Sequence, residues 1–174
     1  MEIIKNKTYC VTGGGGFIGS YLIDDIINKG GFVRTIGNNK DELLILKEKY
    51  GNKIEIIQGD IKDLNSVEEL ITDYTIGLFH LAAFKYVGLA EKNPRDCINS
   101  NVIGTLNILN VSVKYKLEFV MCSSTASSVQ TTTTYGATKM LMEKLFNQYQ
   151  IENPNMKFGI IRLGNVLYST GSVS

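Results

Sequence analysis

The sequence predicts an α/β protein with a doubly wound parallel sheet, in which helices cover both faces of the sheet. Two observations predict it: short apolar runs alternate with longer segments of helical spacing, and the first run leads directly into a glycine-rich loop. The expected strands are Thr8–Thr12, Phe32–Ile36, Ile54–Gln58, Ile76–Leu81, Glu118–Ser123 and Lys157–Leu163. The chain of 174 residues is expected to form a single domain, residues 1–174.

Two helices are marked by apolar stripes, at Ser20–Lys29 and at Leu141–Tyr149, and Gly30–Gly31 ends the first of them. The stretch Ser123–Thr134 is rich in serine and threonine and follows the fifth strand. We expect it to form an active-site loop, and a flexible surface loop is the alternative.

Composition excludes several classes of partner. The net charge is +1 and the charged residues are scattered, so neither nucleic acid nor a membrane surface is expected to bind. No apolar run approaches the ~20 residues that span a bilayer, and the first residues lack a signal-peptide core. Cys10, Cys97 and Cys122 show no metal-ligand spacing and are expected to be reduced thiols. These features predict a cytoplasmic protein without a metal, acting on a small molecule.

The glycine-rich loop is the strongest functional signal. Gly13, Gly16 and Gly19 stand between a strand and a helix, with Phe17 and Ile18 completing the loop. Glycines at this spacing allow a tight turn, a close approach of backbone to pyrophosphate, and close packing of helix on strand. The helix N-terminus would add free N–H groups for the phosphates. The loop therefore predicts a dinucleotide-binding Rossmann domain.

The residues after the second strand bear on which dinucleotide binds. An acidic residue there would accept hydrogen bonds from the ribose of NAD, but the sequence has Gly37, Asn38, Asn39 and Lys40. Lys40 could pair with a 2′-phosphate, or be a solvated surface lysine. We expect NADP, with NAD as the alternative, and include Asn38 and Lys40 in the cofactor site.

Further cofactor contacts are expected at the ends of the third and fourth strands. Asp60, followed by Ile61, is placed to accept a hydrogen bond from the adenine amino group. His80 is the single histidine and is interpreted as a hydrogen-bonded residue that shapes the pocket. The next residues are expected to line the pocket and leave room for a ribose; they are Leu81, Ala82 and Ala83.

Tyr135 and Lys139 form a candidate redox pair. They lie four residues apart and so on one face of a helix. Oxidation of an alcohol needs a base for its proton, and a nearby ammonium and a nicotinamide ring would both favour the phenolate of a tyrosine, whose pKa is ordinarily about 10. Ser124 or Thr125, at the end of the fifth strand, could hydrogen-bond the same substrate oxygen.

Taken with these residues, the sequence resembles the extended short-chain dehydrogenases, and among them the UDP-N-acetylglucosamine 4,6-dehydratases of polysaccharide biosynthesis. The matching motifs are His80–Val87, Asn93–Thr105, Tyr135–Lys139 and Arg162–Val173. The resemblance implies a UDP-sugar substrate that is oxidised at C4, loses water across C5 and C6, and recovers the hydride. It also implies that Asn165 approaches the substrate phosphates, that Lys85 lies near cofactor and substrate unless it is only a solvated charge, and that Asn101 belongs to the cofactor site. A homo-oligomer is compatible with the resemblance.

The chain departs from that family in two respects. Family members carry an Asp-Lys pair after the Ser-Thr of the fifth strand, whereas Ser124-Thr125 is here followed by Ala126-Ser127. Loss of a positioned acid or base lowers a rate by roughly 10²–10⁴-fold, so dehydration is expected to be nearly abolished. The sequence also ends at Ser174, so most of the family's substrate-binding part is expected to be absent.

Three hypotheses follow from these observations. The first is an NADP-dependent enzyme of the dehydratase/epimerase type acting on a UDP-sugar, or its cofactor-binding portion; Tyr135 and Lys139 favour it. The second is a non-catalytic paralogue that binds a dinucleotide or a partner, which Ala126 and Ser127 favour. The third, a reductase of another carbonyl compound, fits the Arg162–Val173 motif less well.

Overall fold

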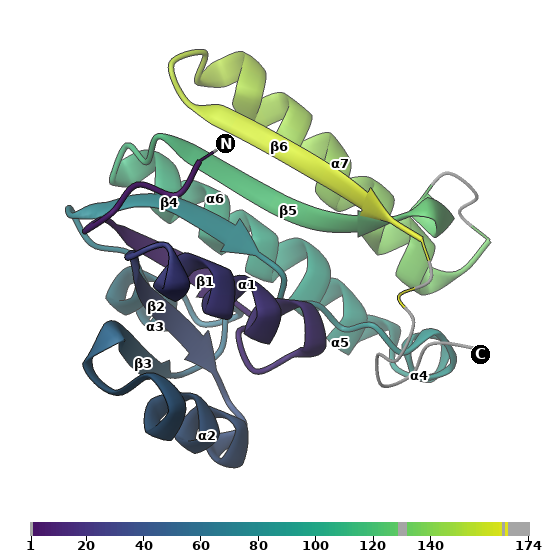
Figure 1. Cartoon of the computed structure of the whole chain (residues 1–174). Helices are drawn as coiled ribbons and strands as arrows, with labels where there is room; N and C mark the ends of the chain where they lie inside the picture. The colour runs from purple at the N-terminus through teal and green to yellow at the C-terminus, as the bar shows by residue number, and fades with distance from the viewer. Residues whose placement is uncertain (1, 129–131, 165, 167–174) are drawn as a thin grey trace.

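The computed structural model describes residues 2–128, 132–164 and 166. Its sheet has six strands in the order β3-β2-β1-β4-β5-β6, and every neighbouring pair is parallel (Figure 1). The strands are β1 Thr8–Thr12, β2 Phe32–Gly37, β3 Ile54–Gln58, β4 Thr75–His80, β5 Phe119–Thr125 and β6 Lys157–Leu163. This is the doubly wound Rossmann arrangement, so the predicted fold class is confirmed.

Helices connect successive strands. They are α1 Phe17–Asn28, α2 Lys40–Tyr50, α3 Leu64–Leu70, α4 Val87–Lys92, α5 Pro94–Ile98, α6 Gly104–Lys114 and α7 Thr134–Glu152. Two short 3₁₀ segments are η1 Gly51–Lys53 and η3 Ala126–Ser128, and η2, Asn99–Ile103, is a π-helical turn that joins α5 to α6. A π turn within a helix often marks a functional site.

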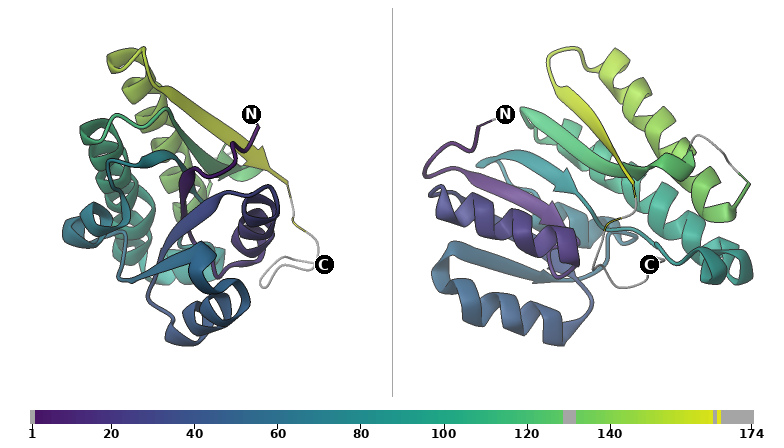
Figure 2. Two further views of the ribbon diagram at one scale, coloured as in Figure 1. Left: turned by 60° about the vertical axis from the view of Figure 1, so that its left-hand side comes forward. Right: turned by 45° about the vertical axis from the view of Figure 1, so that its right-hand side comes forward.

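The helices form a layer on each face of the sheet, as Figures 1 and 2 show. Alternation along β1 separates the two cores, because successive side chains of a strand point to opposite faces. Tyr9 and Val11 pack in the core with residues of α1 and α2, whereas Cys10 packs in the core formed with α3, α6 and α7. A sheet buried in this way needs apolar residues at nearly every strand position, which explains the continuous apolar runs in the sequence.

Several boundaries differ from the sequence prediction. β5 extends to Thr125, so the segment expected as a loop from Ser123 begins inside the strand. α7 begins at Thr134, well before the apolar stripe that predicted it, because Thr133 caps the helix: its hydroxyl accepts a hydrogen bond from Gly136 N at 3.0 Å. An apolar stripe reports only the buried part of a helix, and capping residues decide where the helix starts.

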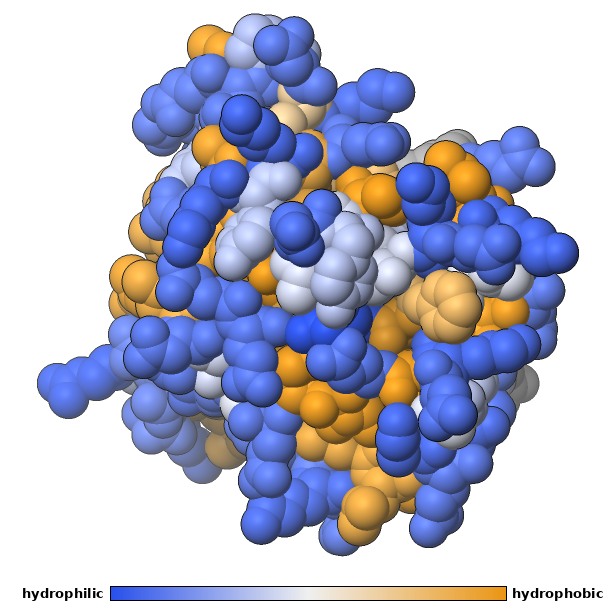
Figure 3. Space-filling view, turned by 90° about the vertical axis from the view of Figure 1, so that its left-hand side faces the viewer, coloured by the Kyte–Doolittle hydropathy of each residue, from blue (hydrophilic) through white to orange (hydrophobic). Residues whose placement is uncertain are grey.

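Figure 3 shows the side of the molecule that lies on the left in Figure 1, at the end of the sheet where the strands begin. Hydrophilic residues dominate this face, with patches of hydrophobic residues between them (Figure 3). Within the part of the chain that the structure describes, no helix combines the length and apolar character needed to cross a membrane.

Candidate nucleotide-binding and redox site

The glycine loop joins β1 to α1 at the carboxyl end of the sheet. Gly13 has a φ of +71°, and a Cβ there would lie 2.8 Å from the backbone nitrogen of Ala82. A Cβ on Gly19 would overlap the carbonyl oxygen of Gly13. Gly16 is the N-cap of α1, and its own Cβ would meet only Gly13 O, at 3.2 Å. Two of the glycines are therefore needed for the fold, and Gly16 keeps the approach to the helix N-terminus open.

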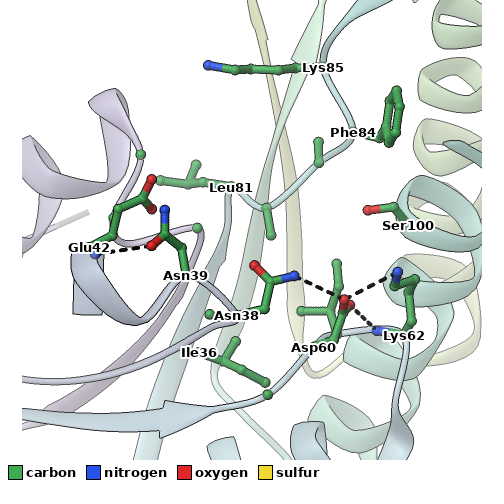
Figure 4. Close-up of a pocket in the computed structure, with 18 of the residues that line it drawn as sticks. Ile36, Asn38, Asn39, Glu42, Asp60, Lys62, Leu81, Phe84, Lys85 and Ser100 are labelled. Atoms are coloured by element: carbon green, nitrogen blue, oxygen red, sulfur yellow. Dashed lines mark hydrogen bonds and ion pairs between the residues drawn. The ribbon is translucent and has the colours of Figure 1, made fainter. Parts of the chain in front are cut away.

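A pocket of about 850 Å³ lies beside this loop, at the carboxyl ends of the strands (Figure 4). Ligands of doubly wound sheets bind at this edge, where the strand order reverses. The predicted cofactor residues that line it are Gly13, Gly16, Phe17, Asn38, Asp60, Ile61, Leu81, Ala82, Ala83 and Lys85. The predicted residues that do not line it are Ile18, Gly19, Lys40, Asn101, Ser124, Thr125, Tyr135 and Lys139.

Asp60 is fixed at one end of the pocket. Its carboxylate accepts a hydrogen bond from the backbone nitrogen of Lys62 at 3.0 Å, and Lys62 Nζ lies 3.3 Å away. Asn38 Nδ2 donates to the other oxygen at 3.4 Å (Figure 4). A carboxylate held on two sides is a pre-oriented acceptor for an amino group of a ligand.

Glu42 is a pocket residue that the sequence analysis missed. Asn39 caps α2 and accepts hydrogen bonds from Asp41 N and Glu42 N, at 3.1 and 3.4 Å. The first turn of α2 then brings Glu42 back to the glycine loop, where a Cβ on Gly15 would lie 2.5 Å from Glu42 Oε2. The signal in the sequence is the pattern Asn39-x-x-Glu42, the spacing of a helix capping box. A carboxylate therefore lines the pocket although none directly follows β2, while Lys40 is exposed.

His80 links the loop between β4 and α4, residues 81–86, called the pocket loop, to the end of β1 that leads into the glycine loop. Its Nδ1 lies 2.8 Å from the hydroxyl of Thr12, and its Nε2 lies 3.0 Å from the hydroxyl of Thr105. The Thr12 hydroxyl also accepts from the backbone nitrogens of Leu81 and Ala82, both at 3.1 Å, so its hydrogen is left for Nδ1. Nδ1 is therefore the acceptor and Nε2 carries the proton. Burial lowers the pKa of His80 to about 3.

Asn101 holds the pocket loop from the helix side. It lies in the π turn η2 and is fully buried. Its side-chain amide accepts from Phe84 N at 2.7 Å and donates to Phe84 O at 3.1 Å. It also donates to the hydroxyl of Thr138 in α7 at 3.0 Å. The structure thus places Asn101 behind the pocket, where it fixes the backbone that carries the lining residues.

Tyr135 and Lys139 lie on the face of α7 that packs on β5. Lys139 is buried and donates to Ser123 O at 2.9 Å; burial lowers its pKa to about 8. A side-chain hydrogen bond joins Tyr135 to Thr125. Burial raises the pKa of Tyr135, the thiol of Cys97 raises it further, and the bond to Thr125 lowers it. The charge of Lys139 was expected from the sequence to favour the phenolate, but desolvation of the phenol is the larger effect here.

Ser124 and Thr125 contact different residues of α7. Thr125 faces Tyr135, whereas Ser124 donates to Glu143 of α7 at 2.6 Å. The structure therefore brings Thr125, and not Ser124, to the phenol. Glu143 was missed by the sequence analysis, although it continues the four-residue spacing of Tyr135 and Lys139.

The two predicted substrate residues differ in what the structure shows. Lys85 is exposed, and its ammonium lies 5.4 Å from the ring centre of Tyr86. Figure 4 places Lys85 at the opposite end of the pocket from Asp60. Asn165 lies outside the described residues.

A Rossmann fold with a nucleotide-sized pocket at the carboxyl ends of its strands, and a tyrosine and a lysine on the neighbouring helix, defines the class of this protein as an extended short-chain dehydrogenase. The chain belongs to the polysaccharide biosynthesis protein family, whose model matches residues 9–174. The resemblance noted in the sequence is confirmed.

Two curated relatives match nearly the whole chain. A protein of Methanocaldococcus jannaschii, named an uncharacterized membrane protein, is 34% identical over 173 residues, covering 97% of this chain and 52% of its own. The UDP-glucose 4-epimerase of Rickettsia massiliae is 32% identical over 178 residues, covering 97% of this chain and 51% of its own. The chain thus spans about half the length of these relatives.

Solved structures match the fold over the same extent. Pen from Bacillus thuringiensis superposes with a TM-score of 0.93 at 28% identity, over 99% of this chain and 54% of that one. The UDP-glucose 4-epimerase of Bifidobacterium longum, solved with NAD⁺ and UDP, superposes with a TM-score of 0.81 at 23% identity, over 90% of this chain and 52% of that one. These proteins therefore share the fold of this chain over about half of their own length.

Proposed function

We propose that this protein is an NAD(P)-dependent nucleotide-sugar enzyme of polysaccharide biosynthesis, or the cofactor-binding portion of one, that oxidises C4 of a UDP-N-acetylglucosamine-like sugar. The observation that carries the proposal is the pairing of Tyr135 with Thr125 at the same edge of the sheet as the glycine-loop pocket. A domain that only bound a nucleotide would not need a buried lysine beside that tyrosine.

Tyr135, Thr125 and Lys139 each have a separate role in the proposed reaction. Tyr135 takes the proton of the C4 hydroxyl, and Thr125 hydrogen-bonds the same oxygen. Lys139 holds the end of β5 through Ser123 O, at 2.9 Å, and the hydrogen bond from Thr125 stabilises the phenolate. A nicotinamide dinucleotide, when bound, supplies the hydride acceptor. Gly13 and Gly16 provide the backbone approach that its pyrophosphate requires.

The proposed cofactor is NADP, with NAD as the alternative. Neutral amides, Asn38 and Asn39, stand where a ribose-binding carboxylate would otherwise follow β2, and Lys40 adds a positive charge next to them. The Glu42 carboxylate in the pocket acts in the opposite direction, because it repels a 2′-phosphate. Calorimetric titration of the chain with NADP and NAD tests the preference, and equal or reversed affinities would show that Lys40 does not select the cofactor.

The proposed reaction stops short of dehydration. Elimination of water across C5 and C6 needs an acid and a base beyond Tyr135, and Ala126 and Ser127 stand where related dehydratases carry an Asp-Lys pair. Incubation with UDP-N-acetylglucosamine and NADP, followed by mass spectrometry, should show no product lighter by one water. Such a product would mean that other residues perform the elimination.

A non-catalytic dinucleotide-binding module is the second candidate, and Ala126 and Ser127 favour it. The two candidates are separated by a single comparison between the natural chain and Tyr135→Phe. The enzyme hypothesis expects both chains to bind the dinucleotide, while only the natural chain reduces it when a UDP-sugar is added. Binding without reduction in both chains would support the module.

A further inference from the structure

One stripe of α7 contacts consecutive residues of β5. Tyr135, Lys139 and Glu143 follow one another at intervals of four residues, which places them on one face of the helix. Tyr135 bonds Thr125, Lys139 bonds Ser123 O at 2.9 Å, and Glu143 bonds the Ser124 hydroxyl at 2.6 Å. The first two belong to the proposed redox site. Glu143 has no role in that chemistry.

Glu143 is the centre of a polar cluster that joins separate segments; Glu143 and the two serines are buried, whereas the side chain of Arg162 is 55% exposed. One of its oxygens accepts from Ser124 Oγ at 2.6 Å, from Ser128 Oγ at 2.7 Å and from Arg162 Nε at 3.0 Å. Its other oxygen accepts from a terminal nitrogen of Arg162 at 2.6 Å. Arg162 stands opposite Ser124 in the ladder between β6 and β5. The cluster therefore connects α7 to the ends of both strands and to η3.

The burial of Glu143 and of the two serines indicates that the cluster serves to fix the arrangement of these segments. Glu143 is 6% exposed, and Ser124 and Ser128 are each 4% exposed. A buried carboxylate is costly unless it is fully paired, and an apolar side chain would stabilise the same space at least as well. Thr125 O also lies 2.7 Å from Ser128 Oγ and shares its single hydrogen with Glu143, so the cluster reaches the backbone of the residue that faces Tyr135.

We propose that Glu143 is a positioning residue: through Ser124 and Ser128 it fixes the end of β5, so that the Thr125 hydroxyl faces the Tyr135 phenol. The inference deepens the proposed function and rests on it for its use in catalysis, since Tyr135 is the proposed proton acceptor. The effect of Glu143 on the position of Thr125 can be measured without any enzymatic turnover. Through Arg162 the same carboxylate also fixes the end of β6, three residues before Asn165.

The direction in which the pKa of Tyr135 changes distinguishes a positioning role of Glu143 from a direct effect of its charge. The hydrogen bond from Thr125 lowers that pKa, so releasing Thr125 should raise it. Removing the negative charge of Glu143 would by itself favour the phenolate and lower the pKa. The pKa of Tyr135 is also raised by its burial and by the Cys97 thiol of α5. A substitution at Glu143 replaces neither of these two contributions.

The experiment titrates the full chain with 3-fluorotyrosine incorporated, because fluorine makes the phenol more acidic and brings its titration into a range where the chain stays folded. Fluorine NMR follows the signal that Tyr135→Phe removes. Glu143→Gln should raise the pKa of Tyr135 by about one unit, the size expected for loss of one hydrogen bond to a charged group. Glu152→Gln, at the exposed end of the same helix, is the control and should leave it unchanged.

A double-variant comparison completes the test. Thr125→Val should raise the pKa of Tyr135 as much as Glu143→Gln does, and the two changes together should raise it no further, because both remove one interaction. Ser128→Ala, a smaller change, should shift the pKa in the same direction and serves if Glu143→Gln does not fold. An unchanged or lowered pKa in a folded Glu143→Gln or Ser128→Ala chain, or additive shifts in the double variant, would overturn the proposal. Retained turnover in Tyr135→Phe would overturn the proposed function instead, and leave this result standing.

Discussion

The buried histidine gives the sharpest prediction about stability. His80 is the single histidine of the chain, it is completely buried, and burial lowers its pKa from 6.5 to about 3. Both ring nitrogens are already bonded to threonine hydroxyls, and the Thr12 hydroxyl has no lone pair left for a second proton on Nδ1. We therefore expect the folded chain to keep His80 neutral well below the pH at which the unfolded chain protonates it.

The sign of the pH dependence follows from the two pKa values. Between pH 6.5 and pH 3 the unfolded state binds one more proton than the folded state at this residue, so stability falls as the pH falls. Above pH 6.5 the ring is neutral in both states and contributes no slope. The loss is about 2 kcal/mol at pH 5, from a slope of about 1.4 kcal/mol per unit below the unfolded pKa.

Urea denaturation from about pH 7.5 to about pH 5, followed by circular dichroism, measures the effect. A loss of about 2 kcal/mol should lower the urea midpoint by roughly 1 M. His80→Gln removes the titration, so we expect this variant to be less stable at neutral pH but to lack the fall toward pH 5. Glu143, with a pKa of about 2 against an ordinary 4.5, adds its own loss only at lower pH.

Two results would refute this reasoning. The first is a His80 ring that titrates near its ordinary pKa in the folded chain, followed by NMR, because the ring would then be open to water. The second is an equal fall in stability toward pH 5 in the natural chain and in His80→Gln, because the proton would then bind elsewhere.

Three further predictions concern the pocket. Gly16→Val should remove dinucleotide binding and change the melting temperature by only a few degrees, since the residue has an ordinary φ of −73° and the new side chain enters the pocket; tight binding by the variant would refute the phosphate-loop assignment. Glu42→Gln should raise the ratio of NADP to NAD affinity roughly fivefold to tenfold by removing a charge that repels the 2′-phosphate, whereas the exposed Glu48→Gln in the same helix should not, and calorimetry decides between them. Asp60→Asn should weaken NADP and NAD equally, by about tenfold, because it acts at the adenine end; a changed ratio would place Asp60 elsewhere.

The sequence predicted best those features that depend on neighbouring residues. The bounds of β1 and β3 are those expected, because each apolar run is closed by a polar or glycine residue. The glycine loop and Asp60 were found because their position after a strand in a doubly wound sheet is enough to place them at its carboxyl edge.

The features that the sequence did not predict depend on contacts between distant segments. The choice between Ser124 and Thr125 depends on which residue of α7 each one contacts, and a strand expected to end at Ser123 gives no position for either of them. Asn101 was placed in the cofactor site by resemblance, but the π turn that points its amide at Phe84 leaves no mark in apolar periodicity. Glu42 reaches the pocket only because α2 folds back over the glycine loop.

The polar networks behind the site share a property that bears on how it works. The His80 ring joins β1 to α6, Asn101 joins the pocket loop to α7, and Glu143 joins α7 to the ends of β5 and β6. Each of these side chains is buried and bonded at both ends. Apolar residues would hold the same elements together with less desolvation. These networks therefore fix the orientation of the segments that they join more than they add to stability.

Helix α7 shows the consequence of that arrangement. Thr138 bonds Asn101 on one side, Lys139 bonds Ser123 O, and Glu143 bonds Ser124, so the helix is fixed at three positions within about two turns after Tyr135. A base held by packing and by buried hydrogen bonds needs no reorganisation when its substrate arrives, and groups positioned in this way are the ones that accelerate proton transfer. The side chains around Tyr135 are therefore those expected of a site arranged before any ligand binds.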